Sequence, residues 1–131
     1  MKTLLKIASI AGLLGVMIGA FGAHLLKPFM NEEQLATFNT GSKYHLIHSL
    51  SIILLAILYQ QFQLKQFKTA AYFHFVGILL FAGSLYLIAL KDFFHINHWT
   101  FLGPITPLGG LSFMIGWALL FIGSTKINFK N

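Results

Sequence analysis

Residues 15–27 read GVMIGAFGAHLLK and close the first long apolar segment of the chain. On an α-helix their spacing would align the small residues along one seam, where missing side chains let a second helix approach closely. At about 100° per residue, His24 lies roughly 160° from that seam. The segment therefore predicts a helix with a packing surface on one side and a histidine on the other. The seam consists of Ala8, Gly12, Gly15, Gly19 and Gly22.

The composition is that of a membrane protein. Of the 131 residues, 56% are hydrophobic and only 9% are charged, whereas soluble domains carry about a quarter charged residues. The sequence has no cysteine, which excludes disulfides, thiolate metal sites and cysteine nucleophiles. All nine basic residues are lysines scattered singly at segment ends. We therefore expect no nucleic-acid partner and interpret the formal net charge of +6 as a topology signal.

Long apolar segments divide the chain into candidate membrane spans. Each has about 20 residues, enough for a helix to cross a hydrocarbon core of about 30 Å. We predict an all-α, four-transmembrane-helix bundle forming a single integral membrane domain over residues 1–131. Short connections make sequential helices antiparallel neighbours. The predicted helices are Leu4–Leu26, Tyr44–Phe62, Ala70–Leu90 and Leu108–Ser124.

The lysines predict the orientation of these spans, because cytoplasmic loops carry an excess of them. Four crossings place Lys2, Lys6, Lys65, Lys68, Lys126 and Lys130 on one side. Fewer lysines fall on the other side, together with all the acidic residues: Lys27, Lys43, Lys91, Glu32, Glu33 and Asp92. We therefore predict an inner (plasma) membrane protein with both termini in the cytoplasm.

A cleaved signal peptide is an alternative interpretation of the N-terminus. Lys2 and Lys6 would form its basic region, and residues 20–22 would be the small-x-small cleavage site. The apolar run is long for a signal peptide, and cleavage would remove a helix suited to packing. We expect the segment to be retained.

The ends of the helices carry local signals. Residues 31–34 (NEEQ) resemble a helix start, and we predict a short interfacial helix through Phe38 with a bend at residues 40–42 before the second span. The third helix would begin with Tyr72 and His74 at the inner interface. Thr106 would cap the fourth helix, with Pro107 in its first position.

The fourth helix carries a small-residue seam of its own. This seam makes the first and fourth helices candidates to pack seam to seam. Its residues are Gly109, Ser112, Gly116 and Gly123.

Several short strings together resemble a known family. They are GAFGAH at residues 19–24, Tyr44-x-x-x-His48, GSLY at residues 83–86, ITPLGG at residues 105–110 and Gly116-Trp117. In this order, and across nearly the whole chain, they resemble the YgdD/YwdK family of small bacterial inner-membrane proteins, a domain of unknown function. The resemblance implies a four-helix membrane protein that keeps its first helix. It implies no established activity, substrate or cofactor.

Ionisable and polar side chains in the outer half of the spans are the candidate site residues, because such groups are costly in a membrane. They are His24, Tyr44, His48, Ser84 and Tyr86. A cluster of these residues would bind a lipid headgroup, a quinone or a small solute, or relay protons. The competing interpretation is a set of interhelical hydrogen bonds that only fixes the packing.

The histidines raise a second hypothesis, a divalent metal bound by neutral imidazoles of His24 and His48, with His45 or a loop histidine as the third ligand. A haem held by histidines of two helices is a related alternative. The predicted spans contain no acidic residue that could accept a hydrogen bond from the second nitrogen of such a histidine. We therefore predict no cofactor.

The function that the sequence favours is that of a non-enzymatic binding or accessory membrane protein. Its small size favours a homo-oligomer or a place in a larger membrane complex. The alternatives are a small oligomeric transporter or channel, and a metal or haem subunit. With only three acidic residues, most acid–base hydrolytic schemes lack parts.

Overall fold

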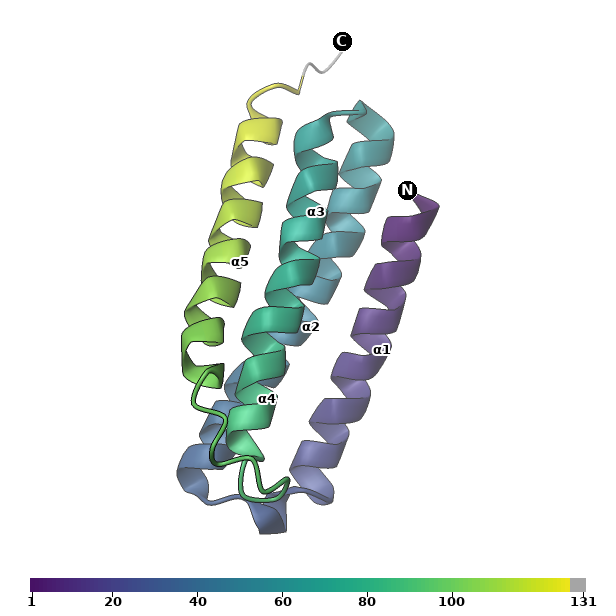
Figure 1. Cartoon of the computed structure of the whole chain (residues 1–131). Helices are drawn as coiled ribbons and strands as arrows, with labels where there is room; N and C mark the ends of the chain where they lie inside the picture. The colour runs from purple at the N-terminus through teal and green to yellow at the C-terminus, as the bar shows by residue number, and fades with distance from the viewer. Residues whose placement is uncertain (128–131) are drawn as a thin grey trace.

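The computed structural model describes residues 1–127 and is entirely helical apart from its connections (Figure 1). Its helices provide four stretches that are long and apolar enough, by length and composition, to cross a membrane. The all-helical prediction with four candidate spans is therefore confirmed. Lys130, which entered the lysine count, lies outside the described residues. In chain order the elements are α1 (Lys2–His24), η1 (Lys27–Phe29), α2 (Glu32–Phe62), α3 (Lys65–Gly77), η2 (Ile78–Ala82), α4 (Gly83–Ala89) and α5 (Leu102–Ser124).

The second and third spans form the centre of the bundle. Helix α3 continues through η2, a π-helical turn, into α4, so residues 65–89 form one continuous span. Helix α1 packs mainly against α2, whereas α5 packs mainly against α3, η2 and α4. Figure 1 shows α1 and α5 on opposite sides of this central pair, with the start of α1 and the end of α5 at the same end of the bundle.

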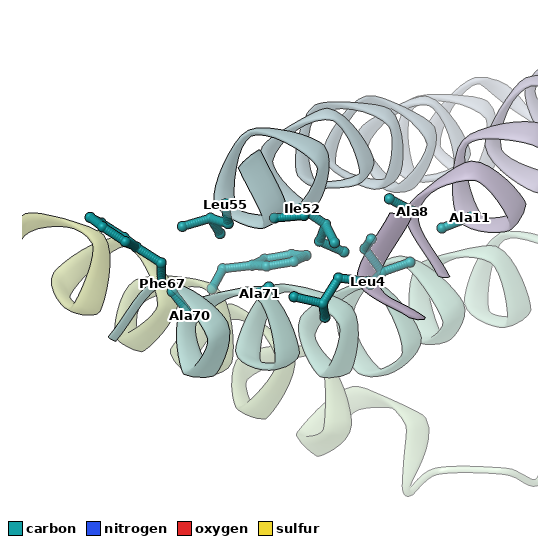
Figure 2. Close-up of a cluster of buried hydrophobic side chains, with 11 residues drawn as sticks. Leu4, Ala8, Ala11, Ile52, Leu55, Phe67, Ala70 and Ala71 are labelled. Atoms are coloured by element: carbon teal, nitrogen blue, oxygen red, sulfur yellow. The ribbon is translucent and has the colours of Figure 1, made fainter. Parts of the chain in front are cut away.

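A core of buried apolar side chains joins α1, α2 and α3 near that end (Figure 2). Ile52 and Leu55 of α2 and Phe67 of α3 belong to this cluster, and all three are fully buried. Ala70 and Ala71 of α3 add little bulk, so the helices approach closely. In a membrane such packing stabilises the bundle through van der Waals contact, because lipid chains are as apolar as the side chains.

The two small-residue seams do not pack against each other, so the predicted pairing of the first and fourth helices is wrong. Gly22 of α1 receives the ring of Phe38 from α2. Gly116 and Gly123 of α5 receive the rings of His74 and Phe67 from α3. Each glycine thus accommodates a large ring, and a second glycine seam would leave that space empty. Gly12 is an exception, because a side chain there would have open space around it.

Helix α2 begins where the sequence predicted a helix start but does not bend at residues 40–42. The Asn31 side chain accepts a hydrogen bond from the Gln34 backbone, and the Gln34 side chain accepts one from the Asn31 backbone, each at 2.9 Å. The helix then continues to Phe62. Gly41 is buried against Leu85, which a Cβ atom would approach to 3.2 Å. The glycine therefore serves close packing of α2 on α4, and the predicted bend is wrong.

The predicted starts of the third and fourth spans are also corrected. Helix α3 begins at Lys65, so His74 is its tenth residue and lies inside the span instead of at the inner interface. Helix α5 begins at Leu102 and contains Pro107. Pro104 sits in the first turn, where a missing N–H group costs nothing. The Thr106 hydroxyl, which was predicted to cap the helix, accepts or donates a 2.6 Å hydrogen bond with Ser84 of α4.

Candidate functional site between α2 and α5

His48 is the most completely bonded of the predicted site residues. The Trp117 indole N–H on α5 donates to His48 Nε2 at 3.1 Å. Because Nε2 accepts this bond, the ring proton belongs on Nδ1, which donates to the Tyr44 carbonyl at 2.8 Å. The Phe113 ring stacks on the imidazole with a centroid distance of 3.5 Å. These contacts hold His48 as a neutral ring with both nitrogens occupied.

His74 lies beside His48 and was not among the predicted site residues. Its fully buried ring meets the His48 ring edge-on at 5.0 Å. Ser51 Oγ is 2.9 Å from His74 Nδ1. His74 Nε2 is buried without a hydrogen-bond partner among the described residues, although the Phe113 backbone is near enough to interact with the ring. Together Ser51, His48 and His74 form a buried polar cluster, which the half-exposed Trp117 borders from α5.

A groove of about 350 Å³ runs along this cluster between α2 and α5. The Tyr44 ring forms part of its wall and packs against Phe81 at 4.7 Å between centroids. Tyr44 is 39% exposed, and its hydroxyl makes no hydrogen bond within residues 1–127. The groove therefore combines aromatic walls with one free polar group. Its lining is Tyr44, His48, Phe81, Pro107, Gly110, Leu111, Phe113, Met114 and Trp117.

The other predicted site residues lie elsewhere. Ser84 donates to the Phe81 carbonyl at 3.0 Å as well as bonding Thr106. Tyr86 bonds His45 Nδ1 at 3.1 Å. His24 is exposed at the end of α1. The five candidates thus fall into the groove (Tyr44 and His48), two interhelical hydrogen-bonded pairs and an isolated histidine.

The three histidines of the metal hypothesis are not assembled in this structure. The described chain contains no group of three or more His, Asp or Glu side chains placed to hold a metal ion. His48 lies sixteen residues beyond the start of α2, about 24 Å along the helix, whereas His24 ends α1. His45 faces Tyr86 and α1, while His48 faces α3 and α5. The long uninterrupted α2 is what separates these side chains.

Sequence reasoning missed His74 and Trp117 because their roles depend on neighbouring helices. Placing the third helix too late along the chain put His74 at the wrong depth. One signal was available: Ser51 shares a helix face with Tyr44 and His48, and this face marks the side of α2 on which the cluster forms.

The fold and this site define a multi-pass helical membrane protein with a polar cluster inside the bundle. The sequence profile of a family described as "Protein of unknown function (DUF423)" matches residues 18–110. The chain is 38% identical to the UPF0382 inner membrane protein YgdD of Escherichia coli, over 98% of this chain and 94% of that one. It is 35% identical to the UPF0382 membrane protein YwdK of Bacillus subtilis, over 96% of this chain and 98% of that one.

A third relative, a UPF0382 membrane protein of Staphylococcus saprophyticus, is 31% identical over 97% of this chain and its own full length. The chain therefore belongs to the uncharacterised UPF0382 (DUF423) family of membrane proteins, as the sequence resemblance indicated. No solved structure matches it.

Proposed function

We propose that this protein is a non-enzymatic binding or accessory protein of the plasma membrane that takes a largely apolar ligand from the bilayer into the α2–α5 groove. The observation that carries the proposal is the unbonded Tyr44 hydroxyl on the wall of a 350 Å³ aromatic groove. Ligand sites are mostly apolar hollows with a few placed polar groups. A hydroxyl that faces lipid without a partner gains a hydrogen bond when a ligand supplies one.

The chemistry of the groove supports binding more than catalysis. No carboxylate lines it, and both nitrogens of His48 already have partners. His48 therefore contributes a flat neutral wall and holds Trp117 in place, and it does not offer a free base. The groove opens on the side of the bundle, so a ligand dissolved in the bilayer would enter without crossing water.

The proposed topology has four antiparallel helices that cross the membrane with both termini in the cytoplasm. The lysine distribution supports this orientation, and the start of α1 and the end of α5 lie at the same end of the bundle (Figure 1), as a cytoplasmic position of both termini requires. Tyr44 would then lie near the outer end of the span of α2.

Cysteine labelling tests the topology, because the sequence contains no cysteine. We expect Asn97→Cys to react with a membrane-impermeant maleimide in intact cells, and Lys2→Cys to react only after the cells are opened. Labelling of Lys2→Cys from outside would overturn the orientation without affecting the proposal for the groove.

Trp117 provides a reporter for occupancy of the groove. In a Trp99→Phe background it is the sole tryptophan, and a bound lipid with a brominated chain would quench its fluorescence. We expect quenching in detergent to saturate as brominated lipid is added, because a bound site fills. Quenching that only rises in proportion to the lipid would contradict a binding site.

A variant with a blocked groove, paired with a control variant elsewhere, tests whether the quenching arises in the groove. Gly110 lines the groove, and a Cβ atom there would make ordinary contact with the Phe81 ring at 3.7 Å. Gly110→Leu should therefore fill the groove and abolish the saturable component. Gly12→Leu adds the same side chain to open space on α1 and should leave it unchanged. Circular dichroism establishes that both variants are folded.

A further inference from the structure

A second hollow lies at the end of the bundle opposite the termini, where α2 begins and α4 ends. It has a volume of about 220 Å³ and a largely polar lining that includes charges of both signs. Its lining is Asn31, Glu33, Gln34, Thr37, Ile88, Ala89, Lys91, Asp92 and Asn97.

We call this hollow the end pocket, and a hydrogen bond from Gln34 fixes the position of its Asp92 carboxylate. The Gln34 side chain is 9% exposed, and its Nε2 donates to Asp92 Oδ2 at 2.6 Å. Its Oε1 is already used by the Asn31 backbone, so the whole amide is fixed. Asp92 Oδ1 makes no hydrogen bond that the structure records. The pocket therefore presents an acceptor with a defined position.

Opposite charges line the pocket without neutralising each other. Within residues 1–127, neither Glu33 nor Lys91 forms an ion pair, and Asp92 bonds only Gln34 among side chains. A ligand that carries both a positive and a negative group would satisfy all three. An ammonium group would meet the carboxylates, and a phosphate would meet Lys91 and the positive end of the α2 helix dipole.

The lining also favours one class of headgroup over others. A quaternary ammonium is recognised by aromatic rings, and none of the residues lining the pocket is aromatic. An anionic headgroup without an amine would leave the carboxylates of Glu33 and Asp92 unpaired and repelled. A primary ammonium donates three hydrogen bonds, which suits a pocket rich in carboxylate and amide oxygens.

The end pocket and the groove lie on one face of α2. Glu33, Thr37, Tyr44 and His48 follow intervals of four, seven and four, which keep them within one stripe of the helix. Thr37 and His48 line the two hollows and are about 16 Å apart along the helix axis. A lipid with its headgroup in the end pocket would therefore lay a chain toward the groove.

We infer that the end pocket binds a phosphoethanolamine group, and that the ligand is a phospholipid with this headgroup and a chain in the α2–α5 groove. The part about the chain rests on the function proposed above, whereas the part about the headgroup rests on the end pocket alone.

Brominated phospholipids that differ only in headgroup test the inference, with Trp117 fluorescence as the readout in the Trp99→Phe background. We expect the phosphatidylethanolamine to quench at about tenfold lower concentration than phosphatidylcholine or phosphatidylglycerol, the effect of about one charge-assisted hydrogen bond. Free phosphoethanolamine serves as a competitor. If it displaces the lipid, the soluble group is also a ligand. If it does not while the lipid preference persists, the ligand is the lipid alone.

Charge variants with matched controls test whether the end pocket is where the headgroup binds. Glu33→Gln combined with Asp92→Asn should remove the preference for phosphatidylethanolamine, whereas Glu32→Gln, one residue away and outside the pocket lining, should keep it. Lys91→Gln should weaken binding, and Lys27→Gln should not.

The outcomes separate this inference from the proposed function. Saturable quenching that is equal for all headgroups, or a preference that the pocket variants leave intact, would overturn the phosphoethanolamine site while the groove proposal stands. An absence of saturable quenching with every lipid would overturn both the groove and the lipid as its ligand.

Discussion

His45 and His48 lie three residues apart on α2 yet have opposite surroundings. His45 links helices: its Nδ1 bonds the Tyr86 hydroxyl on α4, and its ring interacts with the Ala11 backbone on α1. An apolar hollow of about 280 Å³ lies beside it, lined by aliphatic side chains and Phe75. His48 also has both nitrogens bonded, but the hydroxyl of its neighbour Tyr44 makes no hydrogen bond within residues 1–127.

The difference teaches that a buried histidine does not by itself mark a binding site in this bundle. Both rings are nearly fully buried and hydrogen-bonded. What distinguishes the α5 side is an unsatisfied polar group in an accessible aromatic groove. On the α1 side His45 and Tyr86 are hydrogen-bonded to each other, so the arrangement there serves packing.

The largest expected effect on stability is that of a glycine substitution on the α5 side, compared with one on the α1 side. A Cβ atom at Gly109 would collide with the backbone of Phe81, which cannot turn aside as a side chain can. Gly109→Ala should therefore destabilise the bundle by about 2 kcal/mol, within the range for overpacked sites. Gly12→Ala, on the α1 side, meets nothing within 4 Å and should cost almost nothing. Unfolding of the purified protein by SDS in mixed micelles measures both, and equal losses would contradict the contrast.

His48→Phe removes the acceptor of the Trp117 indole N–H. We expect a loss of about 1 kcal/mol, typical of an interhelical hydrogen bond in a membrane, together with a blue shift of Trp117 emission in the Trp99→Phe background. His45→Phe is the matched control and should leave the emission unchanged, because His45 faces the other side of α2. A similar shift in both variants would show that the two sides are not independent.

The His45–Tyr86 pair should contribute less. A double-mutant cycle with His45→Phe and Tyr86→Phe should give a coupling energy of about 0.6 kcal/mol, the average for such pairs in membranes. Neither single variant should change lipid quenching of Trp117. A coupling near zero would mean that the pair contributes through packing alone, and altered quenching would connect it to the groove.

Tyr44→Phe should have the smallest effect on stability. Its hydroxyl has no partner among the described residues, so its removal leaves no group unpaired and should change the free energy of unfolding by about zero. It should nevertheless weaken saturable quenching by brominated lipid. A loss of stability comparable to that of His48→Phe would indicate a hidden protein partner for the hydroxyl and would weaken the binding proposal.

The span count and the start of α2 were predictable because they depend on local sequence. Apolar length predicts a span, and the Asn31 and Gln34 side chains bond backbone groups only three residues away. The bend at residues 40–42 was predicted incorrectly because Gly41 serves a distant contact with α4. The start of the last helix was also predicted incorrectly. Pro107 lies inside α5 and not at its first position, and the Thr106 side chain bonds Ser84 of α4 instead of capping the helix.

The candidate site was predictable only in part. Tyr44 and His48 were identified because they are polar and share one helix face. His74 was placed at the wrong depth, and Trp117 was named only as part of the family resemblance. The spacing of residues on one helix does not show which side chain of another helix packs against its glycines. The two seams indicated that α1 and α5 pack closely against other helices. Their partners are side chains of α2 for α1, and rings of α3 and the Phe81 backbone of η2 for α5.

The sequence by itself determined that this is a helical membrane protein with four candidate spans and a family membership. The helices and spans follow from composition and apolar length, which are local properties of the sequence. The family follows from comparing the order of residues with that of relatives. Only the tertiary structure decided which small residue receives which ring, and that His48 meets Trp117 while His45 meets Tyr86. The physical reason is that a transmembrane helix can pack on several faces, and shape complementarity between helices selects among them.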